Sequence, residues 1–270
     1  MAISNVIPEI WETSLLVAFR KAHKFAPLVN RNYEGAIRSA GDTVKITTPA
    51  AITVGAYSGT VSYETPTSTQ QSLLIDQDVY WGFTLDDAEQ VQANVNLVDA
   101  YMQEAAYSLA DNVDANIAAL YTDAGAGNLT IDLTGTHDMY TTAVDAGRNL
   151  DLQNVPREGR WMVISPLGYA ALLKNTKFSQ ASALGDAVVQ SGAVGQVAGF
   201  SVYVSNNLVL STTRRWMYGT NAAITFAAQL IKTEALRSTT GFDDLMRGRL
   251  VFGRKVVRPA ALGTIQATEA

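Results

Sequence analysis

Ser165 occupies a position where a hydrolytic nucleophile is often found, at a turn between an apolar strand and a helix. The surrounding segment, RWMVISPLGYAALLKN, lacks the glycine-x-serine-x-glycine pattern of such a nucleophile. Pro166 follows the serine, and proline is favoured at the first position of a helix because its fixed φ suits the first turn. The sequence therefore predicts that Ser165 caps a helix that runs to Lys174.

His23 and His137 are the two histidines of the chain and its remaining candidates for acid–base chemistry near neutral pH. His137 precedes Asp138, but no serine is placed to complete a triad, so we expect a loop or capping role. His23 lies among lysines, and we expect it to be solvated or at a contact. The chain has no cysteine, which excludes thiol nucleophiles and disulfides. We expect no catalytic residue, no cofactor site and no metal site.

Asp76 and Asp78 lie two residues apart and share one face of an expected strand. Paired carboxylates can bind a divalent cation through their oxygens. The same spacing also suits a strand face that is solvated or that contacts another subunit. We treat both residues as candidates for a contact between subunits, and a divalent ion between subunits stays open.

Three glycines punctuate the stretch SGAVGQVAGFSVYVSNNL, at Gly192, Gly195 and Gly199. A phosphate-binding loop leads from a strand into a helix, whereas these glycines lead into an alternating strand pattern. No lysine or arginine lies between Lys177 and Arg214 to meet a phosphate. We interpret the glycines as a structural turn that feeds a strand, which ends at Asn206.

The charges of the chain are divided unevenly along its length, with a net charge of -5. Residues 46–147 contain fourteen acidic residues and no lysine or arginine, and the rest of the chain holds all 20 basic residues and eleven acids. The two parts can neutralise each other within one subunit. They can also meet between copies in head-to-tail association, and the sequence leaves both interpretations open.

The N-terminal segment combines an extended stretch, ISNVIPE, with an expected amphipathic helix over residues 10–25. Its apolar face includes Trp11, Leu15 and Phe19, and Pro27 ends the helix. Such a segment needs a partner surface, so we predict that these three residues contact another subunit. Neither a signal peptide nor an apolar run long enough for a membrane span is recognised, and we expect a protein that is neither exported nor embedded in lipid.

Residues 42–85 show two strand-like arms around a centre rich in glycine, serine, threonine and proline. The outward arm contains DTVKITT, and the return arm alternates from Leu73 to Leu85. A connection this long is unusual in a compact monomer unless it is functional. We therefore expect an extended hairpin that reaches a neighbouring subunit, with contact candidates at Tyr57, Tyr63 and Trp81.

Residues 86–122 have the strongest helical pattern, with apolar residues recurring at steps of three and four. A second helix is expected over residues 138–150, followed by a strand and the helix after Ser165. The remaining segments, from about residue 200 onward, are mostly strands. Helices early in the chain and a strand-rich remainder predict the α+β class.

This order of elements resembles the major capsid proteins of tailed double-stranded-DNA bacteriophages, which share the Hong Kong 97-like capsid fold. The resemblance rests on NVIPEIWETSLLVAFRKAHKFAPLVNRNYEG, on the extended loop and long helix, and on RWMVISPLGYAALLKN and GQVAGFSVYVSNNL. It implies an N-terminal arm at 1–41, an extended loop at 42–85, a spine helix and peripheral domain at 86–137, an axial domain at 138–225, and return strands to the peripheral domain at 226–270.

The resemblance also implies a function. Copies would self-assemble into hexamers and pentamers, forming an icosahedral or prolate head shell around packaged double-stranded DNA in the virion, after assembly in the host bacterial cytoplasm. A portal is one implied partner. Because the arm begins at Met1, a separate scaffolding protein is expected as another. No lysine lies between Lys45 and Lys174 for a cross-link, so non-covalent contacts or a separate cement protein would stabilise the shell. Weak, non-specific contacts with DNA are expected at an inner face bearing Arg20, Lys21, Lys24 and Arg31.

Two other functions are considered. An encapsulin nanocompartment shell has the same fold but encloses a cargo enzyme, and the enclosed content would distinguish it from a phage head. An uncharacterised cytoplasmic enzyme is the alternative of a different class. A reproducible turnover abolished by mutation of His137 would favour that alternative.

Overall fold

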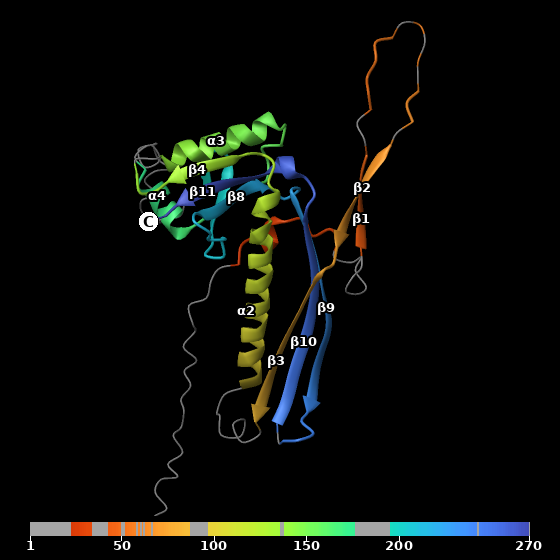
Figure 1. Ribbon diagram of the computed structural model, residues 1–270, viewed down its shortest axis with the longest axis vertical. Helices are drawn as coiled ribbons and strands as arrows, with labels where there is room; N and C mark the ends of the chain where they lie inside the picture. Colours follow the sequence, from red (N-terminus) through yellow and green to blue (C-terminus); the bar gives the residue numbers. More distant parts are fainter. Residues whose placement is uncertain are drawn as a thin grey trace, which may run out of the picture.

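The structure is a computed structural model that describes residues 23–33, 43–49, 52–57, 67–86, 97–135, 138–175, 195–241 and 243–269, together with Gly59, Val61 and 63–65. It is elongated: a body of sheet and helices lies at one end, a long helix and a second sheet extend from it, and a hairpin projects to one side (Figure 1). The observed mixture of helices and sheets confirms the α+β class.

A six-stranded mixed sheet forms the body, in the order β4-β11-β8-β5-β7-β6. Its central strand β5 is buried at all five positions, as expected for a strand covered on both faces. Two helices pack with this sheet, α3 (Met139–Leu152) and α4 (Pro166–Leu173). The strands are β4 (Asn128–Asp132), β5 (Arg160–Ile164), β6 (Gln196–Val197), β7 (Phe200–Val204), β8 (Arg214–Thr220) and β11 (Leu262–Thr268).

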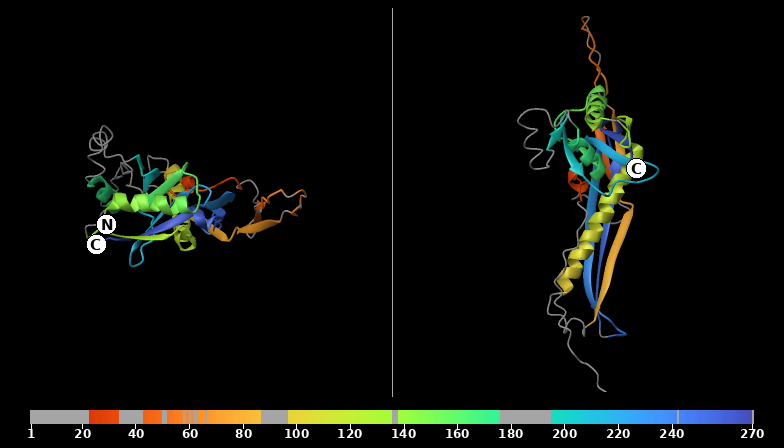
Figure 2. Two further views of the ribbon diagram at one scale, coloured as in Figure 1. Left: turned by 90° about the horizontal axis from the view of Figure 1, so that it is seen from above. Right: turned by 90° about the vertical axis from the view of Figure 1, so that its left-hand side faces the viewer.

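A three-stranded antiparallel sheet extends away from the body, in the order β3-β10-β9. It consists of β3 (Gln77–Asp86), β9 (Ile224–Arg237) and β10 (Asp243–Val256). Helix α2 (Leu97–Ala118) runs beside β3, as both Figure 1 and the right-hand view of Figure 2 show. The helix continues as a 3-10 turn, η3 (Ala119–Asp123), so the expected helix ends close to its predicted limit, and residues 87–96 of that prediction lie outside the described residues.

A separate two-stranded hairpin is formed by β1 (Thr43–Pro49) and β2 (Ser68–Leu74), which pair from Thr43 with Leu74 to Pro49 with Ser68. The expected return arm from Leu73 to Leu85 is therefore divided between two sheets. Beyond the break at 75–76, β3 pairs with β10 instead of β1. Alternation of apolar and polar residues is the same on both sides of the break, so the pattern identified strands without identifying their partners.

Two adjacent strands at one end of the six-stranded sheet, β4 and β11, come from outside the predicted axial segment 138–225. Strand β4 precedes that segment, and β11 follows the long strands β9 and β10 to pair with both β4 and β8. The last strand was expected to return to the peripheral domain with β9 and β10. It lies in the six-stranded sheet because Leu262, Ile265 and Ala267 are all fully buried in the main core there.

Polar caps begin both helices of the body. Asp138 caps α3 by accepting a hydrogen bond from the Tyr140 amide at 2.9 Å. The Ser165 hydroxyl accepts one from the Gly168 amide at 3.1 Å, which confirms the predicted cap.

A two-residue turn, Ala198–Gly199, joins β6 to β7 with φ of 49° and 83°. Positive φ at both central positions matches the twist of the paired strands, and glycine adopts it without steric cost. Gly195 lies just before β6, and Gly192 lies outside the described residues.

The main hydrophobic core contains residues from the six-stranded sheet and the helices beside it, and it includes Phe25 of the N-terminal segment. Phe25 directly precedes the 3-10 turn η1 (Ala26–Leu28), and its side chain is fully buried. Its ring meets that of Trp161 on β5 edge to face, with centroids 6.5 Å apart. The segment 23–33 is therefore part of the folded core.

We predict that Phe25→Ala lowers the free energy of unfolding by about 3–5 kcal/mol, because it leaves a cavity beside Trp161. Denaturant unfolding of the unassembled subunit measures the change. Tyr57→Ala is the matched control, because its side chain is 78% exposed and should change stability by less than about 0.5 kcal/mol. Equal stability of the two variants would contradict the anchoring role of Phe25.

Candidate functional site

The tip of the hairpin carries exposed hydrophobic side chains without a core of their own. Every residue between 52 and 67 whose burial is described is exposed. Large apolar and aromatic side chains here are among the most exposed of those described: Ile52 (72%), Val54 (94%), Tyr57 (78%), Val61 (62%) and Tyr63 (92%). A concentration of exposed apolar surface marks a site of interaction with another molecule.

The base of the same hairpin is fixed to the body by a small second core. Val44, Ile46 and Leu73 of the hairpin, with Ile75, pack against the C-terminal strands at Ala227, Val251 and Val257. The alternating strands thus place their buried face on β9 and β10 while the tip projects away from the body in both figures. This core sets the direction in which the tip is presented.

Two hydrogen bonds and one close approach complete the attachment of the hairpin. The Gln71 side-chain amide donates to the Val257 carbonyl at 3.2 Å, and Lys255 Nζ donates to the Ser72 carbonyl at 2.8 Å. Gly253 lies directly against the Leu74 carbonyl, and a Cβ atom there would stand 3.1 Å from Ile75 Cα. Only a residue without a side chain allows this approach.

The N-terminal segment is fastened to α2 by one buried carboxylate. Asp114 is fully buried, and it accepts hydrogen bonds from the amides of Lys24 at 3.2 Å, Phe25 at 2.8 Å and Ala26 at 3.3 Å. The Asn207 side chain donates to Asp114 at 3.4 Å and to Asp111 at 2.7 Å. A buried carboxylate with this many donors is well satisfied, so it holds the segment against the helix.

The same segment is fastened a second time at the start of β9. The Asn30 amide donates to the Ile224 carbonyl at 2.9 Å, and the Phe226 amide donates back to the Asn30 carbonyl at 2.9 Å. Further upstream, His23 Nε2 lies 3.7 Å from Asp111 Oδ1, and its ring lies 4.9 Å from that of Tyr107. His23 therefore makes contacts within its own subunit, one of the two settings that the sequence allowed.

The predicted contact residues on β3 have partners within the subunit. The carboxylate of Asp78 pairs with the guanidinium of Arg249 on β10, and the hydrogen bonds from Arg249 lower the pKa of Asp78. Trp81 stacks on Phe83 at 5.7 Å, and Phe83 in turn meets Tyr101 of α2 at 5.5 Å. Contacts of these residues with another subunit therefore stay a prediction.

The other predicted residues are placed as follows. Asp76 and Arg31 are exposed, and Lys24 is half-buried beside α2. In the described parts of the chain, no group of three potential ligands is arranged to hold a metal ion. Trp11, Leu15, Phe19, Arg20, Lys21 and His137 lie outside the described residues.

Some of the charge asymmetry is neutralised within the subunit. Asp78 with Arg249 and Asp145 with Arg148 each join the acidic stretch 46–147 to the basic remainder. Both pairs are largely exposed, and exposed ion pairs contribute little to stability.

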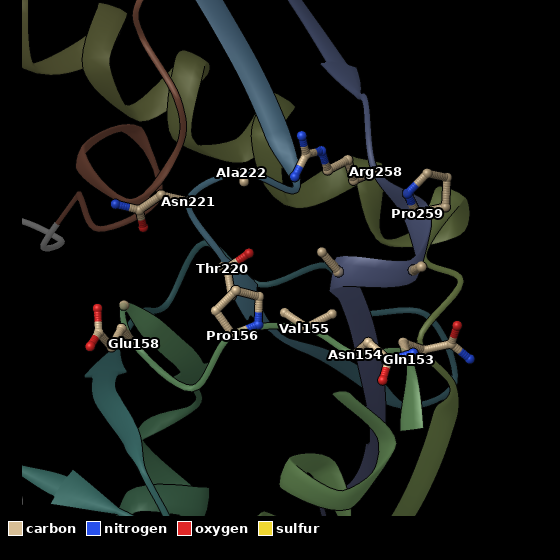
Figure 3. Close-up of a pocket in the computed structure, with 13 residues that line it drawn as sticks. Gln153, Asn154, Val155, Pro156, Glu158, Thr220, Asn221, Ala222, Arg258 and Pro259 are labelled. Carbon is tan, nitrogen blue, oxygen red and sulfur yellow. The ribbon is translucent and has the colours of Figure 1, made fainter. Parts of the chain in front are cut away.

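A pocket of about 650 Å³ opens where three loops meet at the edge of the body (Figure 3). The loops follow α3, β8 and β10, and they come from residues 153–159, 220–222 and 258–261. The walls are mostly apolar, and two charged residues, Glu158 and Arg258, lie on opposite sides in Figure 3. No motif or spacing in the sequence predicts this pocket, because its three loops are far apart in the chain.

These features define a class of protein. A folded body that presents an exposed apolar hairpin tip and a fastened N-terminal segment offers a surface for association with another molecule. Residues 71–265 match the model of a family described as phage capsid protein, so the chain belongs to that family.

Solved structures give the same result. The chain is 30% identical to a structure of Mycobacterium phage Che8, with 98% of each chain covered and a TM-score of 0.78. It shares its fold with the capsid of the cyanophage P-SCSP1u, at 19% identity over 100% of this chain and 95% of the other, with a TM-score of 0.79. The capsid of Ralstonia phage GP4 matches at 13% identity, 100% and 98% coverage and a TM-score of 0.69.

These comparisons establish a structural protein of the phage capsid, and they do not favour the encapsulin alternative. The chain is a major capsid protein that forms the head shell, and its location is the capsid of the virion. No curated protein matches the sequence. Within the described ranges, no helix is both long enough and apolar enough to cross a membrane.

We predict that Gly253→Val leaves the body folded but changes the direction of the hairpin, because the new side chain would displace Leu74 and Ile75. Assembly should fail while the circular dichroism spectrum stays that of the wild type. Gly195→Ala is the control, since nothing lies within 4 Å of a Cβ atom there. Particle yield by sedimentation measures the effect, and normal particles from Gly253→Val would contradict it.

We predict that Asp114→Ala destabilises the subunit by about 1–3 kcal/mol, because three backbone amides lose their acceptor. Residues 23–33 should become the first site of cleavage in limited proteolysis followed by mass spectrometry. Asp123→Ala, at an exposed position, serves as the control. An unchanged cleavage pattern in Asp114→Ala would show that other contacts hold the segment.

Proposed function

We propose that copies of this protein assemble head to tail into hexamers and pentamers, which form an icosahedral or prolate head shell around packaged double-stranded DNA. The observation that carries the proposal is the hairpin, whose tip is exposed and whose base is fixed by a core on β9 and β10. A contact between two different surfaces of the same protein forms a ring when its rotation closes. Rings of five and six are the capsomers of such a shell.

The parts of the subunit have distinct roles in this proposal. The six-stranded sheet with α3 and α4 is the axial domain, and α2 with the three-stranded sheet is the peripheral domain. The hairpin lies across the adjacent subunit, and the N-terminal arm binds a neighbour through Trp11, Leu15 and Phe19. The acidic stretch 46–147 and the basic remainder attract each other between copies and speed their encounter.

Other partners follow from the same proposal. A separate scaffolding protein directs assembly in the host cytoplasm, a portal occupies one vertex, and a cement protein reinforces a shell without cross-links. The inner face bears Arg20, Lys21, Lys24 and Arg31 and meets the DNA backbone weakly. A net charge of -5 supports weak contact, because tight binding of DNA requires many basic groups.

Deletion of residues 56–67 tests the proposal. We expect a folded monomer that does not assemble, because the deletion removes exposed tip residues and leaves the core at the hairpin base intact. Sedimentation velocity and negative-stain microscopy of the wild type and the deletion, each expressed with the neighbouring genes of its source, make the comparison. Normal particles from the deletion would refute the role of the tip.

Salt provides an independent test of the electrostatic part. The rate of assembly should fall as the Debye length shrinks from about 10 Å to about 3 Å, because screening weakens the attraction between the acidic and basic surfaces. Light scattering during assembly at increasing sodium chloride concentration measures the rate. A rate independent of salt would mean that hydrophobic contacts alone drive the association.

A further inference from the structure

The pocket at the edge of the body combines apolar walls with polar and charged side chains. Val155, Pro156, Ala222 and Ala261 contribute apolar walls, and the charged groups of Glu158 and Arg258 lie at the two sides (Figure 3). Pockets with apolar walls and a few placed polar groups bind ligands or anchor residues of a partner. The pocket is therefore suited to an aromatic side chain with a charge beside it.

The first wall of the pocket is held in place by a buried arginine. Arg160 is 4% exposed, and it donates hydrogen bonds to the carbonyls of Val155 at 2.5 Å and Pro156 at 2.9 Å. It also pairs with Asp151 at 2.7 Å, and the hydrogen bonds from Arg157 and Arg160 lower the pKa of Asp151. The loop that follows α3 is thus ordered before any partner arrives.

The other two walls are fixed to each other. The Ala223 amide donates a hydrogen bond to the Thr220 carbonyl at 3.0 Å, which closes the turn after β8. The Ala223 carbonyl in turn accepts hydrogen bonds from the amides of Val257 at 2.9 Å and Arg258 at 3.2 Å. The Ala261 amide donates to the Arg258 carbonyl at 3.0 Å. A preformed pocket needs little ordering on binding, which favours affinity.

The hairpin tip provides a matching pair of neighbouring residues. Tyr63 is 92% exposed, and its ring combines a large apolar surface with a hydroxyl group that can stay at a polar rim. Glu64 follows it and is the only charged residue between Lys45 and Asp76. Its carboxylate, which accepts a hydrogen bond from the Thr53 amide at 3.2 Å, would by its charge favour the Arg258 side of the pocket over the Glu158 side.

We propose that Tyr63 of one copy fills this pocket on an adjacent copy and that Glu64 pairs there with Arg258. The inference rests on the proposed assembly and identifies the surface that receives the hairpin tip. The tip projects away from its own body in both ribbon views, so the occupant is a second copy (Figures 1 and 2). Each copy then donates one tip and offers one pocket, as a closed ring requires.

A disulfide test is direct because the chain contains no cysteine. The full-length double variant Tyr63→Cys with Ala222→Cys should, after mild oxidation of assembled particles, give a ladder of covalent oligomers up to five or six subunits on a non-reducing gel. Reductant should collapse the ladder. The control pair is Tyr63→Cys with Ala106→Cys, which places the second thiol at an exposed position of α2. Absence of the ladder, or an equal ladder from the control, would overturn the proposal.

Charge reversal supplies a second readout. Glu64→Arg and Arg258→Glu should each slow assembly by about tenfold, because like charges then face each other in the docked state. The combination of both substitutions should restore the rate to within about twofold of the wild type. Single variants that assemble like the wild type, or a double variant without recovery, would overturn the pairing. Failure of the wild type itself to form particles would instead count against the proposed function.

Discussion

The small hydrophobic core at the base of the hairpin is the contact that holds the exposed hairpin tip in one position relative to the body. Val44, Ile46 and Leu73 are buried there against Ala227, Val251 and Val257, which lie on or just after the long C-terminal strands. Burial of such side chains contributes about 1.5–3 kcal/mol each, enough to hold a two-stranded hairpin that would be marginal alone. Because the hairpin has this fixed base, its tip can remain exposed and still point in one direction.

Strands β9 and β10 connect this base to the rest of the subunit. β10 lies between β3 and β9, Arg254 on it donates to the Asn116 carbonyl of α2 at 2.7 Å, and its Phe252 belongs to the main core. Asn30 pairs with the first residues of β9, so the N-terminal segment is joined to the same strands. The hairpin, the long helix and the N-terminal segment therefore all contact the same three-stranded sheet. A shell subunit needs such a frame, since small angular errors would accumulate around a closed particle.

The sequence was informative where local chemistry determines structure. The cap at Ser165, the helix that follows residue 138, the strand after Gly199 and the α+β class could all be derived from residue types and spacing. Strand partners could not, since the alternating pattern from Leu73 to Leu85 continues across a break between two sheets. The sheet to which β11 belongs could not be predicted either. The residue pattern of a buried strand shows that it is a strand, but it does not show with which strand it pairs.

The candidate site was predictable only in its exposed part. Low charge and many glycines, serines and threonines identified the hairpin tip, whereas Asp114 looks like any of the fourteen acids of its segment. Its role depends on amides of residues 24–26, about ninety positions away in the chain. The pocket is built from three loops that meet only after folding, so no local pattern could reveal it.

A reconstruction of the assembled particle by electron cryo-microscopy tests the central claim most directly, because it shows where the hairpin of each subunit lies. The account predicts that residues 52–65 of every subunit contact the adjacent copy within a ring of five or six, while β1 and β2 remain packed on β9 and β10 of their own chain. A hairpin tip that contacts only its own chain or solvent in the closed shell would contradict it.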